Sequence, residues 1–283
     1  MTTKTSTMKS FKSLLLTIFT SAIVLMSCKN EDKKKEVEMT APILKEENVI
    51  YEDDGLSMNG FVVYDENIKG ARPAVFIIHE WWGLSDYTKM RARELAKLGY
   101  IAMAIDLYGG GKQADNPATA QELATPFYEN NSKCVTRFVA AENLLKKYPQ
   151  MDSTKVAAIG YCFGGTQVLN LALYGLPLKG VVSFHGGLET YPASVGLTNA
   201  QILICHGEAD SFVPESQVVQ FKAMMDSAKI PYQFKSYKDA THAFTNPDAT
   251  ASGEKFKIPI KYNAAADTAS WNDMKKKKKK TFK

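Results

Sequence analysis

The stretch VAAIGYCFGG, residues 156–165, decides how the rest of the chain is interpreted. An apolar run of small and β-branched residues stops at Gly160, a cysteine lies between glycines, and a helix-compatible apolar run covers 168–173. This order predicts a strand, a sharp turn and a helix, as in a nucleophile elbow with Cys162 in place of serine. Glycines at 160 and 164 leave room for the turn, and a helix N-terminus favours thiolate. A buried structural Cys162 is the alternative that this stretch alone leaves open.

Strands and helices are predicted to alternate on both sides of this stretch. A hairpin around Asp53-Asp54-Gly55 opens the fold, and 106–126 is expected to be an irregular, glycine-rich crossing. The other strands are expected at 74–78, 100–105, 180–184, 202–205 and 232–237, and the other helices at 86–98, 134–145, 218–228 and from 264 onward. This pattern predicts an α/β fold, a mainly parallel central sheet with helices on both faces, whose ligands bind at the carboxyl ends of the strands.

The N-terminal segment has the pattern of a lipoprotein signal peptide. Residues 1–27 have a lysine-bearing head and a short apolar run, and the sequence Leu25-Met26-Ser27-Cys28 resembles a bacterial lipobox. Cys28 is then the lipidated residue that anchors the chain to the membrane, in the bacterial envelope facing the periplasm or the cell surface. The charged stretch 28–46 is expected to be a solvated tether. An uncleaved membrane helix or plain secretion is the alternative.

The C-terminal segment 275–283 carries an unbroken lysine run. Of the 35 Lys and Arg residues, three lie in 1–27 and seven in 275–283, which leaves 25 against 30 acidic residues. The formal charge of +5 therefore comes from the ends. A solvated helix end explains the lysines, and no nucleic-acid partner is expected because no recognition motif accompanies them.

The segment 47–274 has the length of one α/β domain, expected to be monomeric. Cys134 falls in a helical pattern and Cys205 in an apolar strand, where thiols are ordinarily buried. No cysteine pair has the spacing of a metal site, and a disulfide between two cysteines remains open in an oxidising compartment.

Four polar residues follow predicted strands: Glu80, Cys162, Asp210 and His242. The order nucleophile, acid, histidine is that of α/β hydrolases. His242 can take and return the proton of the thiol, and Asp210 can fix the tautomer of that histidine. Glu208 competes for the acid's role, but Asp210 is preferred because it stands in a strand-Gly-x-x-Asp arrangement before Val-Pro, where α/β hydrolases usually place the acid. Asp210 alone would otherwise be a helix N-cap, and His242 alone a loop residue.

A metal centre is the other interpretation of these strand ends. His79, His185 and His206 also follow strands, and together with Glu80 they would supply ligands. No paired-ligand spacing such as His-x-x-x-His is present. We therefore expect neither a metal nor another cofactor, and interpret the three histidines as packed or hydrogen-bonded wall residues.

Residues 47–275 resemble the dienelactone hydrolase family of α/β hydrolases. The resemblance rests on motifs in the family's order: HEWWG at 79–83, DLY at 106–108, GYCFGG at 160–165, HGxxD at 206–210 and HAF at 242–244. It implies a triad of Cys162, Asp210 and His242, with Glu80 holding or accepting the thiol proton in the resting enzyme. It also implies an oxyanion hole formed by the backbone N–H groups of Phe163 and Trp81.

Two family features are absent from the sequence. Family members bind a substrate carboxylate with two arginines, but the matching stretches read GGGK at 109–112 and TNP at 245–247. Lys112 is the remaining cation, and a point charge lacks the bidentate geometry of arginine. Trp82, Tyr108 and Phe244, with the aromatic oxyanion residues, suggest an aromatic pocket for a small ester, lactone or thioester. The same rings would also suit the core.

The sequence thus predicts a lipid-anchored hydrolase that cleaves small carboxylic esters or lactones through an acyl-enzyme on Cys162. The alternative is a lipoprotein that keeps the fold as a ligand-binding module without turnover. The substrate itself does not follow from the motifs, because small changes in a pocket alter specificity.

Overall fold

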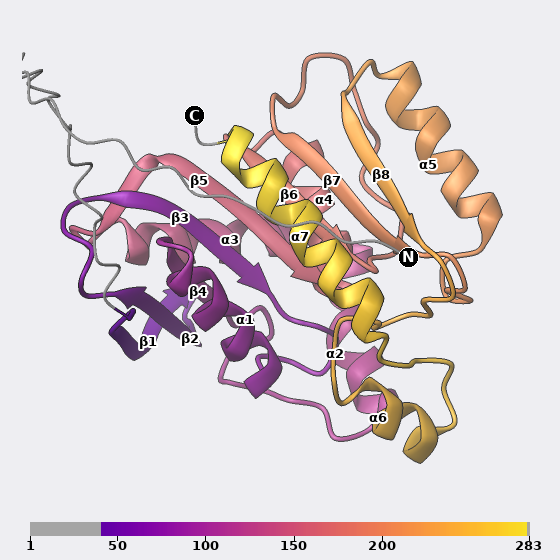
Figure 1. Cartoon of the computed structure of the whole chain (residues 1–283), viewed down its shortest axis with the longest axis horizontal. Helices are drawn as coiled ribbons and strands as arrows, with labels where there is room; N and C mark the ends of the chain where they lie inside the picture. The colour runs from indigo at the N-terminus through magenta and orange to yellow at the C-terminus, as the bar shows by residue number, and fades with distance from the viewer. Residues whose placement is uncertain (1–40, 282–283) are drawn as a thin grey trace, which may run out of the picture. The chain divides into compact units, whose positions relative to one another are not determined.

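The computed structural model describes residues 41–281, with the side chains of 41–277. The expected signal segment and Cys28 lie outside the described residues. Within them, eight strands form one sheet in the order β1-β2-β4-β3-β5-β6-β7-β8 (Figure 1). The strands are β1 Leu44–Asp53, β2 Leu56–Asp65, β3 Arg72–Ile78, β4 Ile101–Ile105, β5 Met151–Tyr161, β6 Gly180–Phe184, β7 Gln201–Gly207 and β8 Tyr232–Tyr237.

Six of the eight strands run parallel. The hairpin β1/β2 and the β2/β4 pair are antiparallel, whereas β4, β3, β5, β6, β7 and β8 pair in parallel. The mainly parallel α/β sheet predicted from the sequence is therefore present. Because parallel strands end at the same edge of a sheet, the residues that follow β3, β5, β7 and β8 emerge side by side.

Helices cover both faces of the sheet. They are α1 Asp86–Lys97, α2 Pro117–Glu129, α3 Ser132–Leu145, α4 Phe163–Leu173, α5 Glu215–Ser227, α6 Ala249–Phe256 and α7 Ala264–Thr281. Helices α1 and α7 share one buried cluster with one face of the sheet, while α2, α3, α4 and α5 share a second cluster with the other face. Figure 1 shows α7 crossing the near face of the sheet.

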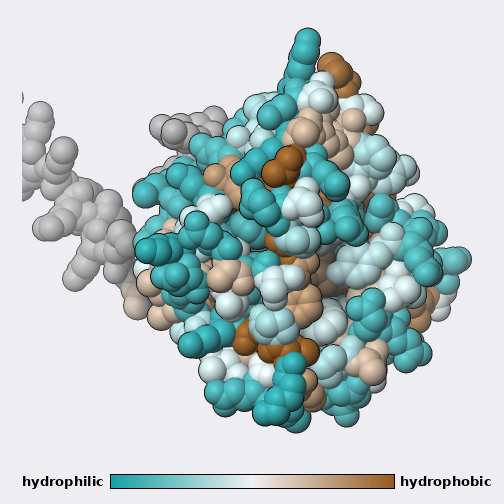
Figure 2. Space-filling view, turned by 90° about the vertical axis from the view of Figure 1, so that its right-hand side faces the viewer, coloured by the Kyte–Doolittle hydropathy of each residue, from teal (hydrophilic) through white to brown (hydrophobic). Residues whose placement is uncertain are grey.

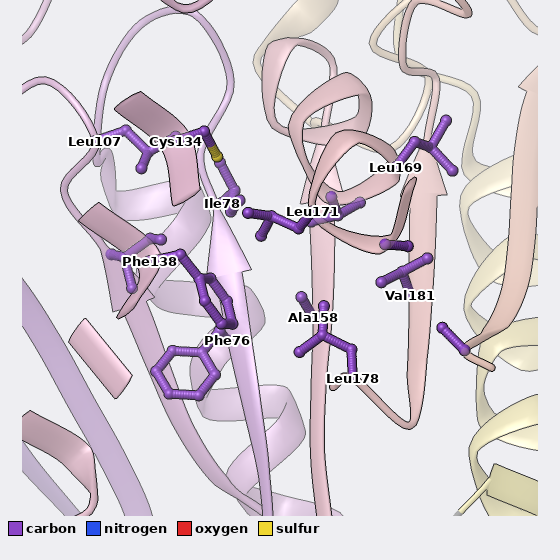
Figure 3. Close-up of a cluster of buried hydrophobic side chains, with 14 of the residues drawn as sticks. Phe76, Ile78, Leu107, Cys134, Phe138, Ala158, Leu169, Leu171, Leu178 and Val181 are labelled. Atoms are coloured by element: carbon purple, nitrogen blue, oxygen red, sulfur yellow. The ribbon is translucent and has the colours of Figure 1, made fainter. Parts of the chain in front are cut away.

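Strand β3 shows why two cores form. Phe76 and Ile78 point into one cluster, whereas Val75 and Ile77 point into the other, because successive side chains of a strand alternate between faces. Figure 3 shows Phe76 against Phe138 of α3, with ring centroids 4.9 Å apart. A strand buried on both faces is a continuous apolar run, as the sequence indicated.

Within residues 41–281, the two cysteines outside the turn are buried free thiols. Cys134 lies in the cluster of Figure 3, and Cys205 lies in the opposite one. Burial raises the pKa of the Cys205 thiol to about 12. Both thiols are packing residues, and neither forms a disulfide with Cys162.

Two expectations about boundaries were wrong, and one helix was missed. The supposed crossing at 106–126 contains the start of α2, because Asn116 caps the helix by accepting a hydrogen bond from the Thr119 amide (3.0 Å) and Pro117 suits its first turn. Strand β1 begins at Leu44, inside the expected tether. Helix α6 had not been predicted.

The C-terminal helix α7 continues through the lysine run to Thr281. Among residues 41–281, no helix combines the length and the apolar character needed to cross a membrane.

Candidate active site

The turn between β5 and α4 has the strained backbone expected at Cys162, with φ 53° and ψ −118°. A Cβ at residue 160 would lie 2.0 Å from the carbonyl oxygen of Gly164, and one at residue 164 would lie 2.3 Å from that of Ile78. Both positions therefore require glycine. The turn places the partly exposed Cys162 at the N-terminus of α4, where the helix dipole stabilises a negative charge.

The acid and the histidine meet beside this turn. Asp210 follows β7, His242 follows β8, and Nδ1 of His242 lies 2.8 Å from Oδ2 of Asp210. The other carboxylate oxygen of Asp210 accepts a hydrogen bond from the Phe212 amide (2.9 Å). Glu208 is exposed, so the geometry favours Asp210 over Glu208 as the partner of His242.

The surroundings of His242 favour its charged form. Burial lowers the pKa of this histidine, but the Cys162 sulfur and the Asp210 carboxylate outweigh burial and hold the pKa well above its usual value. The arrangement therefore supports an imidazolium at His242, beside the Cys162 sulfur.

Glu80 lies after β3 with 2 % of its surface exposed. Its carboxylate accepts a hydrogen bond from Nδ2 of Asn246 (2.7 Å). Burial raises the pKa of Glu80 to about 7, although the Asn246 hydrogen bond lowers it. The contact with the thiol that the family resemblance implies is not present among the described hydrogen bonds. Glu80 instead faces a neutral amide.

Glu80→Gln is expected to stabilise the protein at pH 8 and to leave its stability almost unchanged at pH 4. Folded Glu80 keeps its proton up to about pH 7, whereas the unfolded chain releases it near the ordinary value of 4.5. The native state therefore loses stability as the pH rises through this window, by about 3 kcal/mol at about 1.4 kcal/mol per unit. Urea unfolding of both proteins at pH 4, 6 and 8 measures the difference. A constant difference across these pH values would contradict the assignment.

The two predicted oxyanion residues line the same cavity as Cys162. They are Trp81 and Phe163, and in the described part of the chain neither amide donates to a protein acceptor. Tyr108 fixes one of them indirectly, because its hydroxyl donates to the carbonyl oxygen of Trp81 (2.9 Å). Tyr108 is 4 % exposed and packs on Phe163. The expectation that Tyr108 lines the substrate pocket is therefore wrong; it supports the pocket from behind.

The cavity has a volume of about 200 Å³. Its lining is Glu80, Trp81, Trp82, Gln121, Tyr128, Cys162, Phe163, Gly187, Phe212, Val213, His242, Ala243 and Ile260. This lining contains no lysine or arginine, and Lys112 lies exposed outside it. Phe244 does not line the cavity either, because its ring is fully buried against His185 and Tyr237.

Seen from the side, the surface is mainly hydrophilic, and hydrophobic residues gather around a central hollow (Figure 2).

The three further histidines have partners within the fold. Nδ1 of His79 lies 2.6 Å from the carbonyl oxygen of Glu80, His185 contacts the amide of Cys162, and His206 packs on Phe234. Among the residues described, no group of three or more His, Cys, Asp or Glu side chains is arranged to hold a metal ion.

Comparison with known proteins places this geometry in a family. The profile of the "Dienelactone hydrolase family" matches residues 58–282. The chain belongs to the dienelactone hydrolase family. It is 30 % identical to a putative carboxymethylenebutenolidase of Aquifex aeolicus over 203 residues, which cover 70 % of this chain and 86 % of the relative. The chain is accordingly a hydrolase.

Solved structures agree with this assignment. A dienelactone hydrolase-like promiscuous phosphotriesterase from metagenomic libraries is 33 % identical, with a TM-score of 0.78, over 85 % of this chain and 99 % of that one. The dienelactone hydrolase of Anabaena variabilis is 20 % identical, with a TM-score of 0.58, over 83 % of this chain and 99 % of that one. The second likeness shows the α/β-hydrolase fold alone.

Sequence reasoning missed several residues of the site. Tyr128, Phe212 and Ile260 line the cavity, and Asn246 holds Glu80. Phe212 follows the acid directly and packs on the His242 ring, with centroids 5.0 Å apart, so its nearness to Asp210 was a signal. Tyr128 and Ile260 had none, because they come from α2 and from the loop after α6.

Proposed function

We propose that this dienelactone hydrolase-family member cleaves small carboxylic esters and lactones through a thioester on Cys162. The observation that carries the proposal is the convergence of Cys162, the Asp210–His242 pair and two amides without acceptors on one cavity. In this scheme the thiolate attacks the carbonyl carbon, and the amides of Trp81 and Phe163 stabilise the oxyanion.

The remaining steps use His242. The imidazolium gives its proton to the leaving alkoxide as the carbon–oxygen bond breaks, which leaves the acyl group on sulfur. Water then attacks the thioester, His242 takes its proton, and the thiolate leaves. The products are the carboxylic acid and the alcohol, or a hydroxy acid from a lactone. Asp210 keeps the Nε2 face of His242 toward the sulfur throughout.

The lining of the cavity supports uncharged substrates. It offers aromatic surface from Trp82, Tyr128 and Phe212, and the one carboxyl group among its lining residues is that of Glu80. A substrate carboxylate would enter without a lysine or arginine to pair with it, and the imidazolium of His242 is already paired with Asp210, so binding the carboxylate costs free energy. The preference would therefore differ from that of relatives that bind a carboxylate with arginines.

Phenyl acetate is expected to exceed 3-carboxyphenyl acetate in kcat/KM by at least ~10-fold, because an unpaired carboxylate is costly to desolvate. Gln121→Arg adds a cation to the cavity rim and is expected to narrow this ratio, whereas Gln121→Met, of similar length, is not. Faster turnover of the carboxylated ester by the unmodified protein would contradict the proposed substrate class.

We further propose that the chain is a bacterial envelope lipoprotein anchored through Cys28. Support comes from the lysine-bearing apolar segment 1–27 and from the lipobox-like residues that end at Cys28. In a Gram-negative host supplied with an alkynyl fatty acid, the full chain is expected to incorporate the label and Cys28→Ala is not. A mature protein that retains residues 1–27 would contradict the anchor.

A further inference from the structure

His185 is one of three buried histidines that the proposed reaction does not use. It follows β6, has no exposed surface and adopts φ 41°. Its ring lies behind the catalytic imidazole, with the centroids of His185 and His242 5.3 Å apart and the planes at 63°. Both ring nitrogens of this buried side chain have hydrogen-bond partners, as a buried polar group requires.

The bonds of His185 define its tautomer. The amide of Cys162 is a donor only, and it lies 3.0 Å from Nδ1 of His185, so Nδ1 is the acceptor and carries no proton. Nε2 therefore bears the hydrogen of the neutral ring and donates to Oγ1 of Thr245 (2.7 Å). Burial, and then the neighbouring His242, keep the pKa of His185 well below its usual value.

Beyond Thr245 the contacts continue through the interior. Oγ1 of Thr245 lies 2.6 Å from the Tyr87 hydroxyl, and Arg91 donates to the Thr245 carbonyl oxygen (2.8 Å). Arg91 also forms an ion pair with Asp267 of α7. This path joins the turn after β5, the histidine loop after β8, and helices α1 and α7. We call this series of contacts the elbow brace; it consists of the Cys162 amide, His185, Thr245, Tyr87 and Arg91.

We propose that His185 is a positioning residue, which sets the backbone of Cys162 through Nδ1 and links it to the His242 loop through Nε2 and Thr245. The inference rests on the proposed nucleophilic role of Cys162. A residue other than glycine at positive φ is costly, so its conformation persists only where surrounding contacts hold it. The Cys162 amide has two such contacts, since it also donates to the Phe184 carbonyl oxygen (2.9 Å).

Two variants separate the hydrogen bonds of His185 from its volume. His185→Phe keeps an aromatic ring but removes both nitrogens. In His185→Asn, Oδ1 can occupy the Nδ1 position and accept from the Cys162 amide, and asparagine tolerates positive φ. If the role of His185 were merely structural, the loss of activity would parallel the loss of unfolding free energy in both variants. If His185 positions Cys162, activity is kept only in the variant that still accepts a hydrogen bond from the Cys162 amide.

The test measures kcat and KM for phenyl acetate, the unfolding free energy, and the rate of Cys162 alkylation by iodoacetamide, followed on the peptide by mass spectrometry. For His185→Phe we expect kcat and the alkylation rate to fall by at least ~10-fold with KM within ~2-fold, as for a misplaced reacting group. His185→Asn should recover both to within ~3-fold of the parent protein.

If His185→Phe does not fold, Thr245→Val tests the same brace, because it removes the acceptor of Nε2–H and is expected to lower kcat and alkylation with KM unchanged. Alkylation and kcat within ~2-fold of the parent in the folded variants, or equal losses in the Phe and Asn variants, would overturn the proposal. Alkylation does not require turnover. If alkylation of Cys162 slows in His185→Phe while Cys162→Ala keeps full activity, the result would therefore refute the nucleophilic role of Cys162 but not its positioning by His185.

Discussion

Cys162→Ala is expected to lower kcat/KM for phenyl acetate by about 10⁴-fold or more, because the variant loses the sulfur on which we propose the acyl-enzyme forms. The fold should persist, since Cys162 is partly exposed and the turn is dictated by Gly160 and Gly164. The residual rate would come from the amides of Trp81 and Phe163 acting on bound substrate. Purified protein and initial rates at pH 7 suffice for the comparison.

Cys205→Ala is the matched control. It removes another thiol, which is fully buried in the opposite core and does not line the cavity. Its kcat/KM is expected to stay within a few-fold of the parent's. Its unfolding free energy is expected to fall by about 1 kcal/mol or more, because a buried group is removed. Unchanged turnover in Cys162→Ala would instead favour water as the nucleophile, and complete inertness of the parent toward every ester, lactone and acyl probe would favour a binding module.

His242→Gln is expected to cost about 10³- to 10⁴-fold in kcat/KM, because it removes both the base and the cation beside the sulfur. Glutamine keeps much of the side-chain volume and can still hydrogen-bond to Asp210. Alkylation of Cys162 at neutral pH should slow in parallel, since the sulfur loses the imidazolium that favours its thiolate form. A variant with the parent's activity, or with unchanged alkylation, would contradict the role of His242.

His206→Gln serves as the control for histidine loss near the site. His206 precedes Asp210 in the same segment, but its ring packs on Phe234, and it does not line the cavity. Its kcat/KM is expected to remain within ~3-fold of the parent, as for substitutions outside the reacting groups. An equally large loss in both variants would indicate damage to the loop rather than removal of a base.

The architecture followed from local patterns. The apolar runs of β3, β4 and β5 are buried on both faces of the sheet, so these strands can be predicted from local sequence alone. The turn at Cys162 could be predicted equally well, because only glycine fits at positions 160 and 164. Helix α2 was missed because Pro126 lies within it, and its capping residue Asn116 is informative only once the helix is known.

Several parts of the site depend on contacts between distant residues. Asn246 and Glu80 are 166 positions apart, and nothing in either neighbourhood specifies their hydrogen bond. The brace through His185 and Thr245 joins segments 60 positions apart. Asp210, by contrast, was already preferred over Glu208 in the sequence, and its carboxylate lies 2.8 Å from Nδ1 of His242. Phe244 was misplaced because an aromatic residue after a catalytic histidine suits the core as well as a pocket.

The most direct test of the account is to trap the acyl group on its sulfur. The protein is mixed with excess 4-nitrophenyl acetate, quenched with acid within milliseconds, digested with protease and analysed by mass spectrometry. The account predicts a burst of nitrophenol close to one equivalent and a single acetyl group on the peptide that contains Cys162, absent from Cys162→Ala. Steady turnover with no burst and no acetylated Cys162, at every quench time, would contradict it.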